Sequence, residues 1–251
     1  MIRIKWLTII IALTLTSCTT FRSEDNEKAQ FHLKIGTTHL MNAEYPQALN
    51  ELLMAEKLDD EDPIIQNNLG LAYYFRGQVQ LAEVHLKKSI RLKPDYTDAK
   101  NNLGRVMIET GKIQESIPFL ESAANDLTYI NPEKPVMNLG IAFFKLEKYD
   151  KSIEQLQKSL NYKRDNCLAY SFLGRNYYEL KDFSKATDTL DKAIGYCKKS
   201  QFDEPNYYSA LSYYQLGNVE IAKSRLDEII KMYPFGTYAD KAKSMLEVIQ
   251  K

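Results

Sequence analysis

The fold is decided by one stretch, Pro63-Ile-Ile-Gln-Asn-Asn-Leu69-Gly70-Leu-Ala-Tyr73-Tyr-Phe-Arg-Gly77, and by Ala82, Leu86, Ser89 and Pro94, which follow it. Leu69, Gly70 and Tyr73 stand at positions i, i+1 and i+4, on one face of a helix. Gly77 follows the last of these periodic residues, where helices often end in a left-handed residue. The spacing therefore predicts a first helix that ends near Gly77.

A second helix is expected after this turn. Ala82, Leu86 and Ser89 stand at i, i+4 and i+7, on one helical face. Pro94 ends this helix because proline has no amide donor and clashes with the preceding turn. Gly70 and Ala82 are small, so we expect the two helices to cross closely there.

The same register recurs six times along the chain. The steps between its anchors are 34, 34, 36, 34 and 36 residues. The anchors are Gly36, Gly70, Gly104, Gly140, Gly174 and Ala210. A repeat of this period indicates a solenoid of helix pairs, and such solenoids bind other proteins far more often than they catalyse reactions.

The pattern resembles the tetratricopeptide repeat (TPR). The resemblance implies an all-α, right-handed superhelical solenoid of about six helix pairs over residues 29–236. The expected repeats are 29–62, 63–96, 97–132, 133–166, 167–202 and 203–236. Residues 237–251 are predicted to form a capping helix, in which Tyr238, Ala242, Met245 and Ile249 cover the last repeat.

Composition and missing motifs narrow the function. The 251 residues contain only ten Gly and eight Pro, which fits an all-helical protein, and the continuous repeat argues for one elongated unit. The net charge of zero argues against strong nonspecific nucleic-acid binding. The three histidines have no partners at metal-ligand spacing, and the phosphate-binding loop and nucleophile-elbow motifs are missing. We therefore expect no catalytic residues, metal site, cofactor or small-molecule substrate, and classify the protein as a non-enzyme.

The N-terminus reads as a targeting segment. Arg3 and Lys5 precede an apolar stretch that is too short to span a bilayer, and Leu15-Thr16-Ser17-Cys18 resembles a bacterial lipoprotein box. The expected elements are a signal peptide over 1–17, lipidation at Cys18 and a short polar linker over 18–28. The alternative is an ordinary secretory peptide with a chance cysteine. The residue after Cys18 is Thr19 and not Asp. By the sorting rule for lipoproteins of Gram-negative bacteria, this implies a lipid-anchored protein on the periplasmic face of the outer membrane.

Two further cysteines are predicted to form a disulfide. Cys167 begins the first helix of the fifth repeat, and Cys197 follows the end of its second helix, so antiparallel packing brings them together. An exported protein meets oxidising conditions. The alternative is two free thiols, because Cα atoms more than about 7 Å apart could not be bridged.

A partner-binding groove is expected on the concave surface, which the first helices line in TPR solenoids. The predicted groove residues are Asn67, Tyr74, Asn101, Arg105, Phe144, Arg175 and Tyr178. Arg105 and Arg175 suit a carboxylate or backbone carbonyl of a bound peptide. Two alternatives stay open: the asparagines only link neighbouring helices, and the arginines pair with Glu109 and Glu179, four residues further on.

One irregular step carries a narrower resemblance. Asn101-Asn102-Leu103-Gly104 is followed by the string Tyr129-x-x-Pro132-x-x-Pro135-x-x-Asn138-x-Gly140. Together with the lipoprotein box, this resembles the type IV pilus biogenesis and stability lipoproteins, the PilF/PilW/Tgl pilotins, although the cysteine that some relatives carry beside the fourth anchor is missing.

The pilotin resemblance implies a function and a partner. It implies an outer-membrane lipoprotein that binds a secretin subunit and promotes assembly of the pilus secretin. Two alternatives stay open: a TPR adaptor for cell-wall or envelope assembly machinery, and, as a third class, a hydrolase or pore component.

Overall fold

The computed structural model describes residues 24–198 and 202–249. Within these ranges every regular element is a helix, and the all-α TPR fold predicted from the sequence is confirmed. The expected signal peptide and Cys18 lie outside the described residues.

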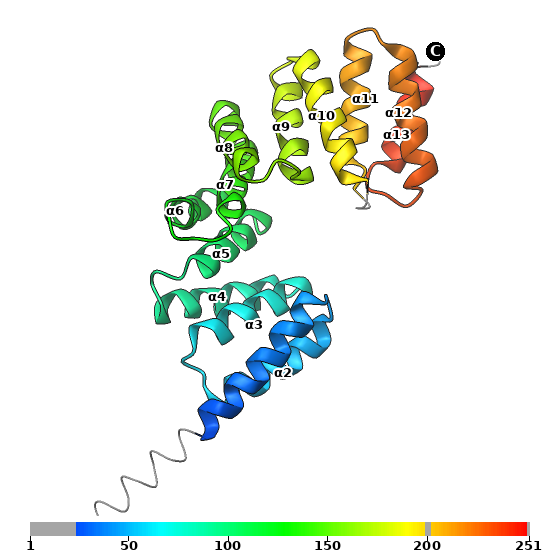
Figure 1. Cartoon of the computed structure of the whole chain (residues 1–251). Helices are drawn as coiled ribbons and strands as arrows, with labels where there is room; N and C mark the ends of the chain where they lie inside the picture. Colours follow the sequence, from blue (N-terminus) through cyan, green and yellow to red (C-terminus); the bar gives the residue numbers. More distant parts are fainter. Residues whose placement is uncertain (1–23, 199–201, 250–251) are drawn as a thin grey trace, which may run out of the picture. The chain divides into compact units, whose positions relative to one another are not determined.

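The helices follow one another with short turns (Figure 1). After a first helix over residues 24–41, the elements are α2 (Tyr45–Leu58), α3 (Pro63–Phe75), α4 (Val79–Leu92), α5 (Thr97–Glu109), α6 (Ile113–Ala124), α7 (Glu133–Lys145), α8 (Tyr149–Tyr162), α9 (Cys167–Glu179), α10 (Phe183–Cys197), α11 (Glu204–Gln215), α12 (Val219–Met232) and α13 (Ala239–Ile249). The chain is already helical at residue 24, so the expected linker over 18–28 is helical in its last part.

The chain forms two compact units, Met1–Gly111 and Lys112–Lys251. The helix over 24–41 and α2–α5 belong to the N-terminal unit, and α6–α13 belong to the C-terminal unit. The sequence had predicted one continuous unit. A repeat period reports how each helix packs on its neighbour and does not report where a stack of helices divides into compact units.

A recurring trio of buried residues forms the core of the helix pairs. In every second helix the residues at i, i+4 and i+7 are buried, which confirms the spacing argument made for Ala82, Leu86 and Ser89. The trios are Ala48-Leu52-Ala55, Ala82-Leu86-Ser89, Ser116-Leu120-Ala123, Ser152-Leu156-Ser159, Ala186-Leu190-Ala193 and Ala222-Leu226-Ile229. This burial supplies the apolar contact that holds the helices of a pair together.

The anchor glycines make room for the central leucine of each trio. A Cβ atom added to Gly70 would lie 2.6 Å from Cγ of Leu86 and 3.3 Å from the carbonyl oxygen of Ala82. The same contact recurs at Gly36, Gly140 and Gly174, each against the leucine sixteen positions later. The close crossing predicted at Gly70 is therefore present, but the side chain that requires it is Leu86 more than Ala82.

The turn inside each pair uses one residue at positive φ. Gly77, Gly111 and Gly217 have φ of 74°, 80° and 78°, which glycine adopts without strain. In the other turns Ala43, Glu147 and Lys181 occupy the same place, with φ of 59°, 58° and 61°. Three turns therefore hold an L-residue in the strained left-handed conformation.

The C-terminal helix covers the last pair, as the sequence predicted. Ala242 is buried together with Ala210 of α11 and Leu226 and Ile229 of α12, and Met245 and Ile249 pack against them. Tyr238 lies just before α13, and its ring packs at a tilt against that of Tyr207, with ring centroids 4.8 Å apart. The exposed end of the repeat stack is thereby closed.

A disulfide joins the two ends of the fifth pair. Cys167 is the first residue of α9 and Cys197 is the last residue of α10, not the residue after it. The structure pairs them, with their Cα atoms 5.2 Å apart. The bridge closes a loop over 30 positions around the α9–α10 pair.

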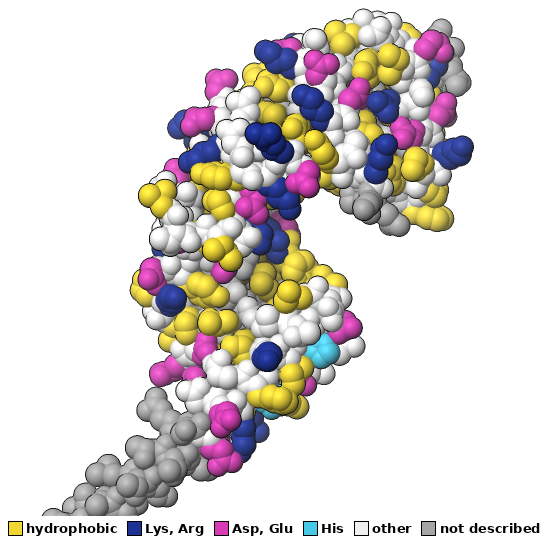
Figure 2. Space-filling model, in the orientation of Figure 1, with side chains coloured by type: hydrophobic (Ala, Val, Ile, Leu, Met, Phe, Trp, Pro, Cys, Tyr) yellow, Lys and Arg dark blue, Asp and Glu magenta, His cyan; other side chains and the backbone are white. Residues whose placement is uncertain are grey.

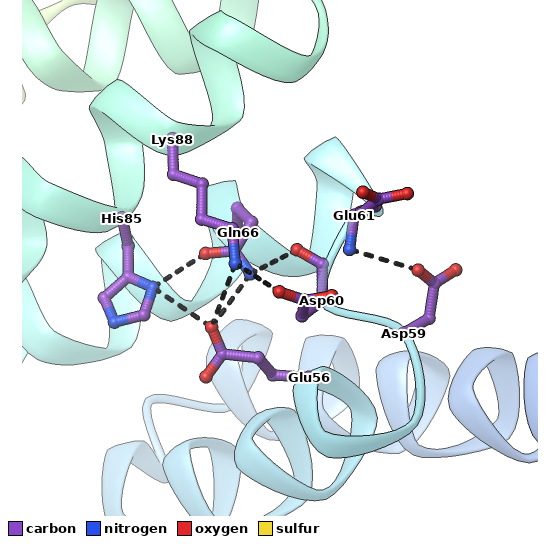
Figure 3. A network of polar contacts seen from close by, with 7 residues as sticks. All are labelled: Glu56, Asp59, Asp60, Glu61, Gln66, His85 and Lys88. Atoms are coloured by element: carbon purple, nitrogen blue, oxygen red, sulfur yellow. Dashed lines mark hydrogen bonds and ion pairs between the residues drawn. The ribbon is translucent and has the colours of Figure 1, made fainter.

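A polar network links α2, α3 and α4 in the N-terminal unit (Figure 3). Gln66 is fully buried, and its Nε2 donates to Glu56 Oε1 at 2.9 Å and to the carbonyl oxygen of Asp60 at 3.1 Å. Its Oε1 therefore accepts a hydrogen bond from His85 Nδ1, 2.8 Å away. Lys88 closes the network through Asp60 Oδ2 at 3.0 Å. Burial lowers the pKa of His85, although the charge of Glu56 acts in the opposite direction.

Candidate partner-binding surface

The predicted groove residues all lie on the first helices of the pairs. Neighbouring first helices touch one another within each unit: α3 contacts α5, α7 contacts α9, and α9 contacts α11. We call the side of these helices that carries the predicted residues the first-helix surface. Asn67, Tyr74, Asn101 and Arg105 place it in the N-terminal unit, and Phe144, Arg175 and Tyr178 place it in the C-terminal unit.

The asparagines form a ladder between first helices. Asn102 Nδ2 donates to Asn67 Oδ1 at 3.0 Å, and Asn67 Nδ2 donates to Asn68 Oδ1 at the same distance. Asn68 Nδ2 donates in turn to Thr37 Oγ1 at 2.8 Å. Asn67 is only 3% exposed, and Asn101 is also buried. This is the linking role that the sequence left open for Asn67.

Arg105 lies over aromatic rings of the preceding first helix. Its guanidinium carbon is 4.4 Å from the ring centroid of Tyr74 and 5.4 Å from that of Phe75, which favours the cation electrostatically. The Tyr74 hydroxyl donates to Glu109 Oε1, and Phe75 stacks on Tyr45 with centroids 4.6 Å apart. Burial, with help from the Glu109 hydrogen bond, raises the pKa of Tyr74 to about 12. Tyr74 therefore stays protonated and keeps donating to Glu109.

Arg175 occupies the equivalent position in the C-terminal unit, one residue after its anchor glycine. Its guanidinium carbon lies 4.6 Å from the ring of Phe144, 4.7 Å from that of Tyr208 and 5.5 Å from that of Phe172. Tyr178 packs edge-on against Tyr208, with centroids 5.4 Å apart. The structure thus places Phe144 directly against Arg175, whereas Tyr178 joins this cluster through Tyr208.

A buried carboxylate already holds Arg175. Glu204 is 8% exposed, and its Oε1 accepts from Arg175 Nη1 at 2.7 Å and from the Tyr238 hydroxyl at 2.9 Å. Ser171 Oγ lies 3.3 Å from its other oxygen. Burial, followed by the charge of Glu204, raises the pKa of Tyr238. The alternative that paired Arg175 with Glu179 is therefore not what the structure shows: the acid is Glu204, which comes from the next first helix, α11.

Sequence reasoning missed Glu204 and Tyr208, which complete the surroundings of Arg175, and it assigned Tyr238 to the cap without its hydrogen bond to Glu204. Glu204 stands 29 positions after the arginine, in the first turn of the next first helix. The signal for this pair is an acid in the first turn of one first helix combined with an arginine in the middle of the preceding first helix. An alignment of the repeats contains this signal. It becomes visible only when positions are compared across neighbouring repeats.

The distribution of charged and metal-ligating side chains indicates which ligands the surface could bind. On the face shown in Figure 2, basic and acidic side chains are intermingled, and neither sign forms a continuous patch. Across the described residues, no group of three or more His, Cys, Asp or Glu could hold a metal ion. None of the helices that the structure describes is both long and apolar enough to cross a membrane. The first-helix surface offers aromatic rings and guanidinium groups, which are suited to binding protein side chains.

Comparisons with known proteins agree with the repeats. Residues 65–93, 135–166 and 206–235 each match a tetratricopeptide repeat family. The human cell division cycle protein 16 homolog is 20% identical over 213 residues, which cover 82% of this chain and 34% of that protein. The chain therefore spans about a third of the length of this larger relative.

Two pilus proteins match over most of their length. The type IV pilus assembly protein PilF of Pseudomonas aeruginosa is 22% identical over 193 residues, which cover 74% of this chain and 77% of PilF. Its solved structure superposes with a TM-score of 0.75 at 17% identity, and the match covers 88% of this chain and 99% of the solved chain. The crystal structure of PilW, a widely conserved type IV pilus biogenesis factor, gives a TM-score of 0.77 at 18% identity, covering 87% and 98%. The chain therefore carries tetratricopeptide repeats and resembles the type IV pilus biogenesis factors PilF and PilW.

Proposed function

We propose that this protein is a lipid-anchored adaptor of type IV pilus biogenesis that binds a secretin subunit and promotes assembly of the secretin at the outer membrane. The observation that carries the proposal is the sequence match to PilF over three quarters of both chains. The lipoprotein box that ends at Cys18 supports the membrane anchor. The fold supports the non-enzymatic role, because TPR solenoids act as protein-binding scaffolds.

The proposed mechanism is physical. The acyl chains on Cys18 hold the protein on the periplasmic face of the outer membrane, since two or more chains anchor a protein stably. The first-helix surface binds a segment of the secretin subunit. The two attachments on one molecule then raise the effective concentration of secretin subunits at the membrane, which favours their assembly without any covalent step.

A lipidation variant tests this proposal. In the bacterium that encodes the protein, Cys18→Ala should leave secretin monomers in the inner membrane or periplasm, measured by membrane fractionation and blotting for multimers. Ser17→Ala is the matched control, because it keeps a small residue before the cysteine and should leave multimers intact. Normal secretin multimers in both the Cys18→Ala strain and a deletion strain would refute the proposal.

Partner capture separates the proposal from its alternative. Pull-down from detergent-solubilised envelopes should recover secretin. Recovery of cell-wall synthases or outer-membrane assembly factors without secretin would favour a general envelope scaffold.

A further inference from the structure

The two arginines of the first-helix surface are equivalent in position but not in partners. Arg105 and Arg175 each follow an anchor glycine, and each lies over an aromatic residue four positions after the preceding anchor, Tyr74 or Phe144. Among the residues that the structure describes, Arg175 alone of the two is paired with a carboxylate, that of Glu204. An arginine at this position therefore accepts a carboxylate, and the Arg105 site is the one that lacks it.

The Arg175 site is filled from within the chain. Arg175 Nη1 holds Glu204 Oε1 at 2.7 Å while aromatic rings lie against the guanidinium group. A guanidinium group presents several N–H donors in a plane, so it binds a carboxylate while its faces stay on the rings. The chain itself thus demonstrates that an arginine in this register, packed on aromatic rings, binds an acidic side chain.

Arg105 is paired with no such acid within residues 24–198 and 202–249. Glu109, which stands four residues later, accepts a hydrogen bond from Tyr74. In the described parts of the chain Arg105 forms no ion pair, and its Nε is buried without an acceptor. Arg175 Nε also lacks an acceptor, so the carboxylate at Nη1 is what distinguishes the two sites.

We propose that Arg105 is a receptor site for an acidic side chain of the protein partner. Tyr74 and Phe75 form the floor of the site, and the 44% exposed ring of Phe75 takes an aliphatic or aromatic side chain next to the acid. A phosphate or nucleic-acid ligand fits less well than a single carboxylate, because the site offers one positive charge and the repulsion by the nearby Glu109 carboxylate grows with the negative charge of the ligand. This inference rests on the proposed function only in assuming that the first-helix surface binds a protein.

A peptide selection on the whole protein tests the site without assuming a partner. The full chain in detergent is used to select from a random twelve-residue peptide library. Peptides selected on the wild type should combine Asp or Glu with a neighbouring apolar residue, and Arg105→Ala should lose this preference. Arg91→Ala, which removes an exposed arginine from the second helix α4, is the matched control and should keep it. Selected peptides without acids, or the same acidic peptides on both proteins, would overturn the proposal.

The strongest selected peptide then tests the carboxylate itself. Changing its acid to the amide should weaken binding about tenfold, as should Arg105→Ala, and the two changes together should add no further loss. Arg105→Lys should fall in between, because lysine keeps the charge but not the planar set of donors. Circular dichroism melting confirms that each variant is folded. Equal affinity for acid and amide would overturn the proposal.

The outcomes separate this proposal from the pilus function. Acidic peptide binding that depends on Arg105, together with normal secretin multimers in the Cys18→Ala and deletion strains, would keep the site and reject the secretin role. Secretin capture by the wild type, together with selected peptides that lack acids or that bind Arg105→Ala equally well, would keep the pilus function and reject the site.

Discussion

Replacing Gly70 by Ala should destabilise the α3–α4 pair, although alanine is the better helix former. The new Cβ atom would lie 2.6 Å from Cγ and 2.9 Å from Cδ2 of Leu86, and 3.3 Å from the carbonyl oxygen of Ala82. Leu86 is fully buried, so its side chain has no open space into which it can turn. The backbones of α3 and α4 must therefore move apart.

The size of the effect follows from two opposing contributions. Overpacking a buried site costs about 1–3 kcal/mol, and the short distance to Cγ places Gly70→Ala at the upper end. The intrinsic helix preference of alanine over glycine returns about 1 kcal/mol. We expect a net loss of about 2 kcal/mol in the free energy of unfolding. Leu86→Ala removes the clashing atoms, so the double variant should lose less than the sum of the two single variants.

Native-state hydrogen exchange of the α3 and α4 amides is the appropriate assay, because repeat proteins open locally. Gly195→Ala in α10 is the matched control. A Cβ atom there meets nothing within 4 Å, so that variant should gain roughly 0.5–1 kcal/mol. A gain of stability in Gly70→Ala, or additive losses with Leu86→Ala, would refute the account of the anchor glycines.

Three further predictions concern a covalent link, a turn and a half-buried histidine. Mass spectrometry of unreduced protein should show Cys167 linked to Cys197, and Cys197→Ser should lower the free energy of unfolding by roughly 3–4 kcal/mol, the loop entropy for 30 residues; two free thiols in protein from the periplasm would contradict this. Lys181→Gly should raise thermal stability by roughly 1 kcal/mol, because φ is 61° there, and a lower melting temperature would argue against strain in this turn. In the folded protein the pKa of His85 is lowered from its ordinary value of 6.5, so below pH 6.5 the unfolded chain binds a proton at His85 more readily than the folded chain does. The free energy of unfolding should therefore fall as the pH falls below 6.5. A pH profile of stability that His85→Asn leaves unchanged would contradict this.

The spacing of the residues was sufficient to predict most of the fold. The trio containing Leu86 could be predicted because a helical face recurs every three to four residues. The turn at Gly77 could be predicted because glycine is common where a helix ends in the left-handed conformation. The left-handed conformation of Glu147 and Lys181 could not be predicted, because neither glutamate nor lysine favours positive φ. The division into two units at Gly111 could not be predicted either, because the repeat pattern describes only how adjacent helices pack.

The candidate site was predicted in its residues but not in its pairings. The register placed Arg105 and Arg175 on the same helical face, and both do lie on the first-helix surface. A helical rule then pointed Arg175 to Glu179, four residues away, whereas the structure pairs it with Glu204. Long side chains reach across to neighbouring helices, so their partners depend on packing between repeats, which a rule for a single helix does not contain.

The central claim is that the first-helix surface binds a secretin subunit, and site-specific photocrosslinking in living cells tests it most directly. A photoreactive benzoylphenylalanine replaces Phe75, which is 44% exposed beside Arg105, or Val84, which is 58% exposed on the second helix α4. The account predicts a crosslinked product with the secretin subunit from position 75 and none from position 84. Absence of a secretin product at position 75, or equal products at both positions, would contradict it.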